Sequence, residues 1–68
     1  RESAAQLHRL LHNLPEPYKE VFSLRTFGER TFGELPFGQI GELFGKSESW
    51  ARVTYFRARQ KLKEALET

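Results

Sequence analysis

The side chains best suited to bind a partner lie in the last third of the chain, in "SESWARVTYFRARQKLKEAL" (residues 47–66). Read at helical spacing, one face of this segment carries Ser49, Arg52, Val53, Phe56, Arg57 and Gln60. Two apolar side chains, Val53 and Phe56, are unusual among arginines on a solvated face, but they suit thymine methyl groups and base edges. The face therefore indicates DNA binding, with three further cations placed for phosphates: Lys46, Arg59 and Lys61.

The distribution of charge agrees with an anionic partner. Residues 1–45 carry five Lys and Arg against six Glu, a balance of −1, whereas residues 46–66 carry six against two, a balance of +4. Glu67 supplies the remaining −1, which gives the net charge of +2. A basic last third on a near-neutral body indicates an anion met by one element. On charge alone, a solvated face rich in Lys and Arg remains the alternative.

No pattern in the sequence indicates catalysis or a metal site. The chain has no Cys and no Asp, and no His stands in a pattern with a candidate serine nucleophile. His8 and His12 lie one helical turn apart, but nothing completes a metal site, so we expect a solvated pair. Gly45-Lys46-Ser47 lacks the upstream glycine and strand of a phosphate loop. We therefore expect no enzyme, no metal and no cofactor.

Length and composition limit the architecture to one small domain of 68 residues. The chain has no Met, so we expect it to be a fragment of a longer protein. The absence of Cys is compatible with the reducing cytoplasm. No apolar run approaches the length of a membrane span, so we expect no membrane partner.

The apolar pattern predicts a compact all-α domain of three to four helices. We expect helices over residues 3–13, 15–27, 36–45 and 47–66, with Gly28 ending the second and Ser47 capping the last. Pro15 and Pro17 suit the first turn of the second helix. The expected apolar faces are Phe37, Ile40, Leu43 and Phe44 on the third helix, and Ala51, Tyr55, Ala58, Leu62 and Ala65/Leu66 on the fourth.

Residues 36–66 match a helix-turn-helix, in which a long second helix follows a tight turn. Gly41 is small at the point where the two helices must cross closely, and Gly45 can take the positive φ of the turn. We expect Ile40, Phe44, Ala51 and Tyr55 to face inward and to fix the crossing.

Three strings, "LPEPYKEVFSLR", "QIGELFGKS" and "FRARQKL", resemble region 4 of bacterial sigma factors of the extracytoplasmic-function (ECF) group. The resemblance extends from Leu14 to Leu66 and implies that residues 1–68 form one sigma region 4 domain, winged-helix-like and with a helix-turn-helix. It implies recognition of the −35 promoter element through the major groove of double-stranded DNA. It also implies docking on the flap of the RNA polymerase β subunit, and masking by an anti-sigma factor.

Carried over by position, the resemblance implies base contacts for Arg52, Val53, Phe56 and Arg57, and DNA backbone contacts for Lys46, Ser47, Ser49 and Arg59. The chain departs from the family at four positions, one of which is Ala51, where Val is more usual. The family usually has Ala where this chain has Gly41, which we expect to loosen the helix by about 1 kcal/mol. Trp50 replaces a small polar residue and is either a packing residue or a further backbone contact. Val53 also replaces a small polar residue, so the base preference there can differ.

The five residues RTFGE occur twice in tandem, at 25–29 and 30–34. Related chains are shorter here, so we interpret the repeat as a duplication, natural or engineered. We expect a lengthened loop, because closure entropy grows slowly with length. A continued helix and an exchange between two registers are the alternatives. We expect Phe27 or Phe32, but not both, to fill the core position.

A protein-interaction module is the competing function. In that case the basic, aromatic face would dock an acidic partner helix instead of DNA. Another kind of helix-turn-helix transcription regulator is a further alternative. Binding to duplex DNA that weakens steeply with salt and prefers one short sequence favours the first interpretation.

Overall fold

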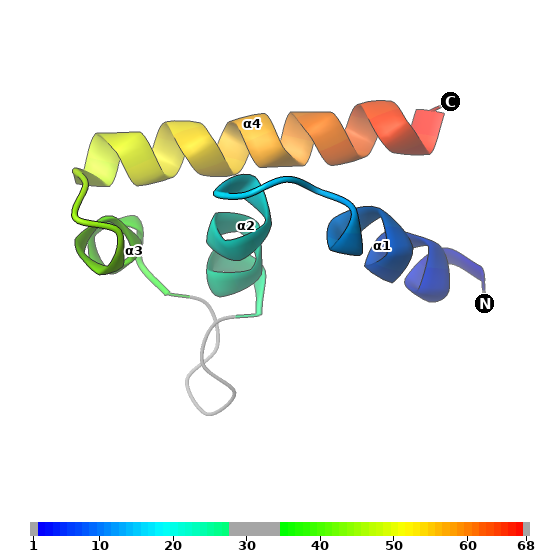
Figure 1. Cartoon of the computed structure of the whole chain (residues 1–68), viewed down its shortest axis with the longest axis horizontal. Helices are drawn as coiled ribbons and strands as arrows, with labels where there is room; N and C mark the ends of the chain where they lie inside the picture. The colour runs from blue at the N-terminus through cyan, green and yellow to red at the C-terminus, as the bar shows by residue number, and fades with distance from the viewer. Residues whose placement is uncertain (1, 28–34, 68) are drawn as a thin grey trace.

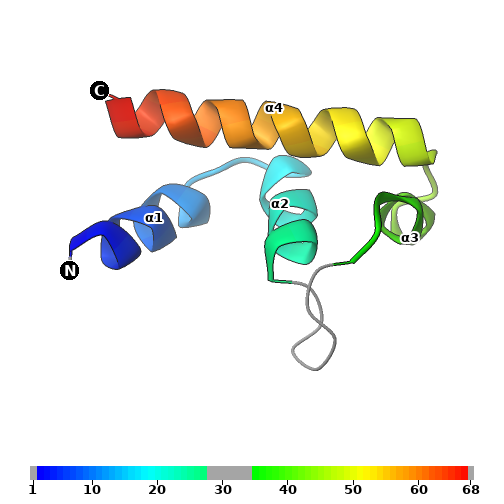
Figure 2. The ribbon, with the colours of Figure 1, turned by 180° about the vertical axis from the view of Figure 1, so that it is seen from behind.

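The computed structural model describes residues 2–27 and 35–67, which form four helices: α1 (Glu2–His12), α2 (Tyr18–Thr26), α3 (Phe37–Leu43) and α4 (Glu48–Glu67). The longest helix, α4, runs along one side of the domain (Figures 1 and 2). Along α4, from its N-terminal to its C-terminal end, α3, α2 and α1 pack against it in that order. No strand occurs among the described residues, and the predicted all-α class is confirmed.

The helix boundaries lie close to the predicted ones. Helix α2 starts one residue after Pro17, and the carbonyl oxygens of Pro15 and Pro17 accept hydrogen bonds from the amides of Lys19 and Val21. The carboxylate of Glu16 accepts a further bond, 3.0 Å, from the amide of Glu20. Pro17 is the N-cap of α2 and Pro15 lies before it, so both prolines precede the helix and do not lie in its first turn, where they were predicted. Neither position needs an N–H donor, because the first amides of a helix have no partner within it. Gly28, the predicted stop, lies outside the described residues.

Two clusters of buried side chains fill the space between α4 and the other helices. The first contains Leu11, Leu14, Phe22, Ala58 and Leu62, and the second contains Val21, Leu35, Ile40 and Ala51. Tyr55 packs against both clusters, and its ring stacks on that of Phe22 with centroids 5.6 Å apart. One face of α4 therefore supports the whole core.

Three predicted core positions are wrong. Leu43 is 64% exposed, because at about 100° per residue it points roughly 90° away from the inward face of α3. Ala65 and Leu66 are exposed, because the buried face of α4 ends at Leu62. Thr54, which was not predicted to face inward, is instead buried between Ala51 and Ala58.

The turn between α3 and α4 depends on two glycines, as predicted. Gly45 has a φ of +67°, a conformation that residues with a Cβ rarely adopt. Gly41 is buried against the turn, and a Cβ built on it would lie 2.6 Å from the backbone oxygen of Ser47. The Gly41 carbonyl accepts a hydrogen bond of 2.8 Å from the amide of Lys46. Gly41 therefore brings the turn closer to α3 than alanine allows. The expectation that glycine loosens the helix here relative to the family's alanine is wrong, because the close approach to backbone atoms outweighs the lower helix propensity of glycine.

The described residues on either side of the duplicated segment are joined directly. The Leu24 carbonyl accepts a hydrogen bond of 3.2 Å from the amide of Leu35, and Arg25 donates one of 3.1 Å to the Leu35 carbonyl. Leu35 is buried in the second cluster, whereas Phe27 is 47% exposed and does not fill a core position. Phe32 and the path of residues 28–34 lie outside the described part. The loop, continued-helix and two-register alternatives therefore stay predictions.

The structure predicts that Gly41→Ala destabilises the domain by about 1–3 kcal/mol, because the added methyl meets backbone atoms that cannot rotate away. Urea denaturation measures the change. Gly38→Ala is the matched control in the same helix, since its Cβ would meet only a glutamate side-chain oxygen at 3.8 Å. The control should be neutral or stabilising by up to about 1 kcal/mol. Equal stabilities of the two variants would contradict the close approach at Gly41.

Deleting residues 30–34 should leave the fold intact and change the free energy of unfolding only slightly. The deletion keeps the three residues whose hydrogen bonds join the ends of the segment, Leu24, Arg25 and Leu35. Halving the connection between Leu24 and Leu35 lowers the entropic cost of closing it by about 0.6 kcal/mol. Urea denaturation and circular dichroism measure stability and helix content. A loss of several kcal/mol would show that the second RTFGE copy contributes contacts to the folded domain.

Candidate nucleic-acid interface

The N-terminal end of α4 is capped by a side chain. The hydroxyl oxygen of Ser47 accepts a hydrogen bond of 3.0 Å from the amide of Trp50, which confirms the predicted cap. Lys46, Ser47 and Ser49 are all exposed at this end. Free backbone N–H groups and the helix dipole make such an end attractive to anions. The three predicted backbone-contact residues therefore surround a surface suited to a phosphate.

The outward face of α4 carries the predicted apolar pair. Val53 is 46% and Phe56 49% exposed, and Ser49 and Gln60 are exposed beside them. At about 100° per residue these four positions fall within roughly 60° of one another around the helix. Arg57 is exposed as well. These side chains are therefore exposed to solvent, as base reading requires.

Arg52 is exposed but held in place. Its Nη2 donates to Oε2 of Glu48 across one helical turn, at 3.0 Å, and its guanidinium lies 5.0 Å from the ring centre of Phe37 in α3. An exposed ion pair at this spacing contributes about 0.3–0.5 kcal/mol, and a contact with a ring contributes about as much or slightly more. The structure thus joins a predicted base-contacting residue to a side chain of the preceding helix.

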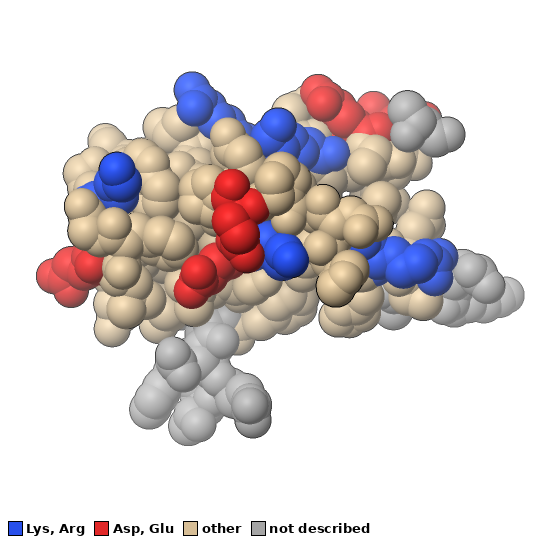
Figure 3. Space-filling model, viewed as in Figure 1, with Lys and Arg blue, Asp and Glu red and all other residues tan. Residues whose placement is uncertain are grey.

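The remaining predicted cations of α4 lie on its two flanks. By helical spacing, Arg52 and Arg59 lie on one flank of the outward face, and Arg57 and Lys61 lie on the other. Arg59 lies 6.0 Å from the ring centre of Phe56, and Lys61 lies 5.0 Å from that of Tyr18 in α2. Basic side chains lie along α4 on the face shown in Figure 3, and acidic ones lie at its C-terminal end.

Trp50 is a packing residue in the structure. It is half-buried against the second cluster, and its ring centre is 5.2 Å from that of Phe44. The ammonium of Lys46 lies 5.9 Å from the same ring. Of the two interpretations that the sequence left open, packing is therefore observed, and a contact between Trp50 and the DNA backbone stays a prediction.

Sequence reasoning missed two residues beside this face, Arg25 and Phe37. Phe37 was expected only as a core residue of α3, but its half-buried ring also contacts two guanidinium groups, those of Arg25 at 4.2 Å and Arg52 at 5.0 Å. Arg25 belongs to the first RTFGE copy and carried no functional signal in the sequence. These contacts join residues far apart in the chain, so spacing along one helix could not reveal them.

Other candidate sites are weaker. His8 and His12 are exposed, and no group of three or more metal-ligating side chains occurs in the described part of the chain. The His8 ring lies nearly parallel to that of Phe27, with centroids 6.5 Å apart. Among the residues that the structure describes, no helix has the length and apolar character needed to cross a membrane.

Comparison with known families agrees with this geometry. Residues 4–62, well over half of the chain, match the family model described as sigma-70, region 4. Comparisons with curated proteins and with solved structures find no match. The matched residues include the turn between α3 and α4 and most of the exposed basic face of α4. The chain therefore belongs to the sigma-70 region 4 family, whose members are DNA-binding domains of sigma factors and not enzymes.

Proposed function

We propose that this domain recognises the −35 element of bacterial promoters as the C-terminal domain of an ECF-type sigma factor, with α4 in the major groove. The observation that carries the proposal is the exposed apolar pair, Val53 and Phe56, flanked by arginines on the otherwise polar outward face of α4. Such a domain works in the cytoplasm, where the bacterial chromosome and RNA polymerase are.

Base reading is assigned to four side chains of α4. Arg52 and Arg57 can donate two hydrogen bonds each to guanine, and Val53 and Phe56 can contact thymine methyl groups. A major groove about 12 Å wide admits one helix. The exposed surface of α4 carries both arginines and apolar side chains, so it offers both kinds of contact to base edges.

Phosphate contacts are assigned to residues around this face. The exposed cations Lys46, Arg59 and Lys61 flank it, and Ser47, Ser49 and Trp50 lie at the N-terminal end of α4. Because the hydroxyl of Ser47 already caps α4, its proposed contribution is to orient backbone N–H groups toward a phosphate. These contacts set the register of the helix, whereas the base contacts supply the selectivity.

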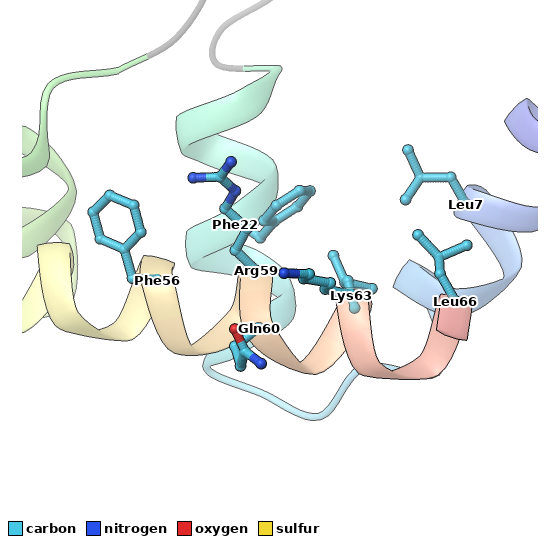
Figure 4. A pocket seen from close by; sticks show the side chains of 8 residues that line it. Leu7, Phe22, Phe56, Arg59, Gln60, Lys63 and Leu66 are labelled. Atoms are coloured by element: carbon cyan, nitrogen blue, oxygen red, sulfur yellow. The ribbon is translucent and has the colours of Figure 1, made fainter. Parts of the chain in front are cut away.

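A groove on the same domain supports a second interaction, with RNA polymerase. It has a volume of about 520 Å³ and lies between α1, α2 and α4, lined by Leu7, Phe22, Phe56, Arg59, Gln60, Leu62, Lys63 and Leu66 (Figure 4). Its lining is mostly apolar and includes two cations but no acidic side chain. An amphipathic helix with acidic flanks fits such a groove. We assign it to the flap of the polymerase β subunit, for which an anti-sigma factor would compete.

Arg57→Ala should weaken binding to the preferred duplex by about 1–3 kcal/mol and relax selectivity at one base pair. Fluorescence anisotropy at low salt, with single-base-pair variants of the duplex, measures both effects. Low salt is needed because an isolated domain lacks the contacts that other sigma regions add. Lys46→Ala is the matched control, which should weaken all duplexes alike and lower the salt slope by about 1. A uniform loss for Arg57→Ala would argue against base reading.

Leu66→Glu should weaken binding to a β-flap fragment by about tenfold or more, because it places a carboxylate among the apolar side chains of the groove. Leu66 is exposed, so the fold should tolerate the change. Leu43→Glu, on an exposed position of α3 that does not line the groove, is the control and should leave flap binding unchanged. Calorimetry measures both variants. Equal affinities would place the flap elsewhere on the domain.

A further inference from the structure

Phe37, the first residue of α3, connects three helices through its ring. The Arg25 guanidinium, from the last turn of α2, lies 4.2 Å from the ring centre, and that of Arg52, from α4, lies 5.0 Å away. The ring also packs against Tyr55, with centroids 5.6 Å apart, and Phe56, with centroids 6.4 Å apart. Two cations and two aromatic side chains therefore meet at one half-buried ring.

The position of this ring is set from both sides. Phe37 follows Leu35, which is buried and whose carbonyl accepts a hydrogen bond of 3.1 Å from Arg25. Tyr55 reaches both core clusters. The core therefore fixes the position of the Phe37 ring, and a side chain that packs on the ring is restricted to fewer conformations.

Arg52 gains most from this support. A free arginine side chain loses rotamer entropy when it is fixed, and a planar group that is already ordered loses less on binding. The contact with the ring uses the electron-rich ring face, and the Glu48 carboxylate binds only Nη2. The other guanidinium donors remain available to a base edge.

We infer that Phe37 is a positioning residue for base recognition: its ring, with Glu48, holds Arg52 in the orientation in which it meets a base. The inference rests on the proposed function of α4. It assigns part of the sequence selectivity to a residue outside the recognition helix. It also links that selectivity to Arg25, at the end of α2 where the duplicated segment begins.

Phe37→Leu tests the inference on the duplex that the wild-type domain selects from a randomised pool, together with its single-base-pair variants. Discrimination should fall by about fivefold or more at the same base pair that Arg52→Ala relaxes. In the Arg52→Ala background, Phe37→Leu should change discrimination less than about twofold, since the two residues act as one unit. Phe37→Tyr, which keeps the ring, should restore the wild-type preference.

Phe44→Leu is the matched control, because it removes a ring at the opposite end of α3, where Phe44 packs against Trp50. It should lower the melting temperature and leave base preference unchanged. If Phe37→Leu relaxes no base pair, or a different one from Arg52→Ala, the inference is overturned and the proposed function stands. If Arg52→Ala itself changes no preference, the base-reading role of Arg52 fails as well.

A second measurement uses the wild-type domain, so its result does not depend on whether a variant folds. In the NMR spectrum of the wild-type domain, the Nε–H proton of Arg52 should be shifted upfield by the Phe37 ring current. Arg57, whose guanidinium contacts no ring among the described residues, provides the unshifted reference. Coincident shifts for the two arginines would overturn the inference.

Discussion

The burial of one narrow face of α4 is the interaction on which the rest of the domain depends. All three other helices pack against α4, and its buried positions, Ala51, Thr54, Ala58 and Leu62, form a single stripe. Most of these side chains are small, so the other helices approach α4 closely. Because α3, α2 and α1 all use the same stripe, the opposite side of the helix is left to solvent. The domain obtains its core and its exposed basic face from one helix.

Aromatic side chains connect these two sides of α4. Tyr55 lies at the edge of the buried stripe, stacks on Phe22 and meets the exposed ring of Phe56 edge-on, with centroids 5.1 Å apart. Phe37 extends the group to α3. Rings have few rotamers and large contact areas, so they hold an exposed surface in a fixed shape at low entropic cost. Phe56 also lines the groove, where the proposed DNA and polymerase surfaces adjoin.

The features that the sequence predicted correctly depend on residues close together in the chain. The cap at Ser47, the turn at Gly45, the close approach at Gly41 and the exposure of Phe56 each follow from neighbouring residues or one helical period. Predictions failed where the packing between helices decides which side chains are buried. Leu43 and Leu66 have the apolar character of core residues, but Leu43 points away from the inward face of α3, and Leu66 lies past the last buried position of α4. Thr54 is polar, yet it is buried because its position on α4 faces the core.

The sequence by itself determined the helical class, the glycine turn, the capped start of α4 and the basic, aromatic character of its free face, because these depend on residues a few positions apart. Only the tertiary structure decided that Leu35 belongs to the core, that Trp50 packs on Phe44, and that Arg25 and Arg52 meet at Phe37. Most of these contacts join different helices across a connection or a turn. Their geometry is set by how closely the helices approach, which no repeat along a single helix encodes.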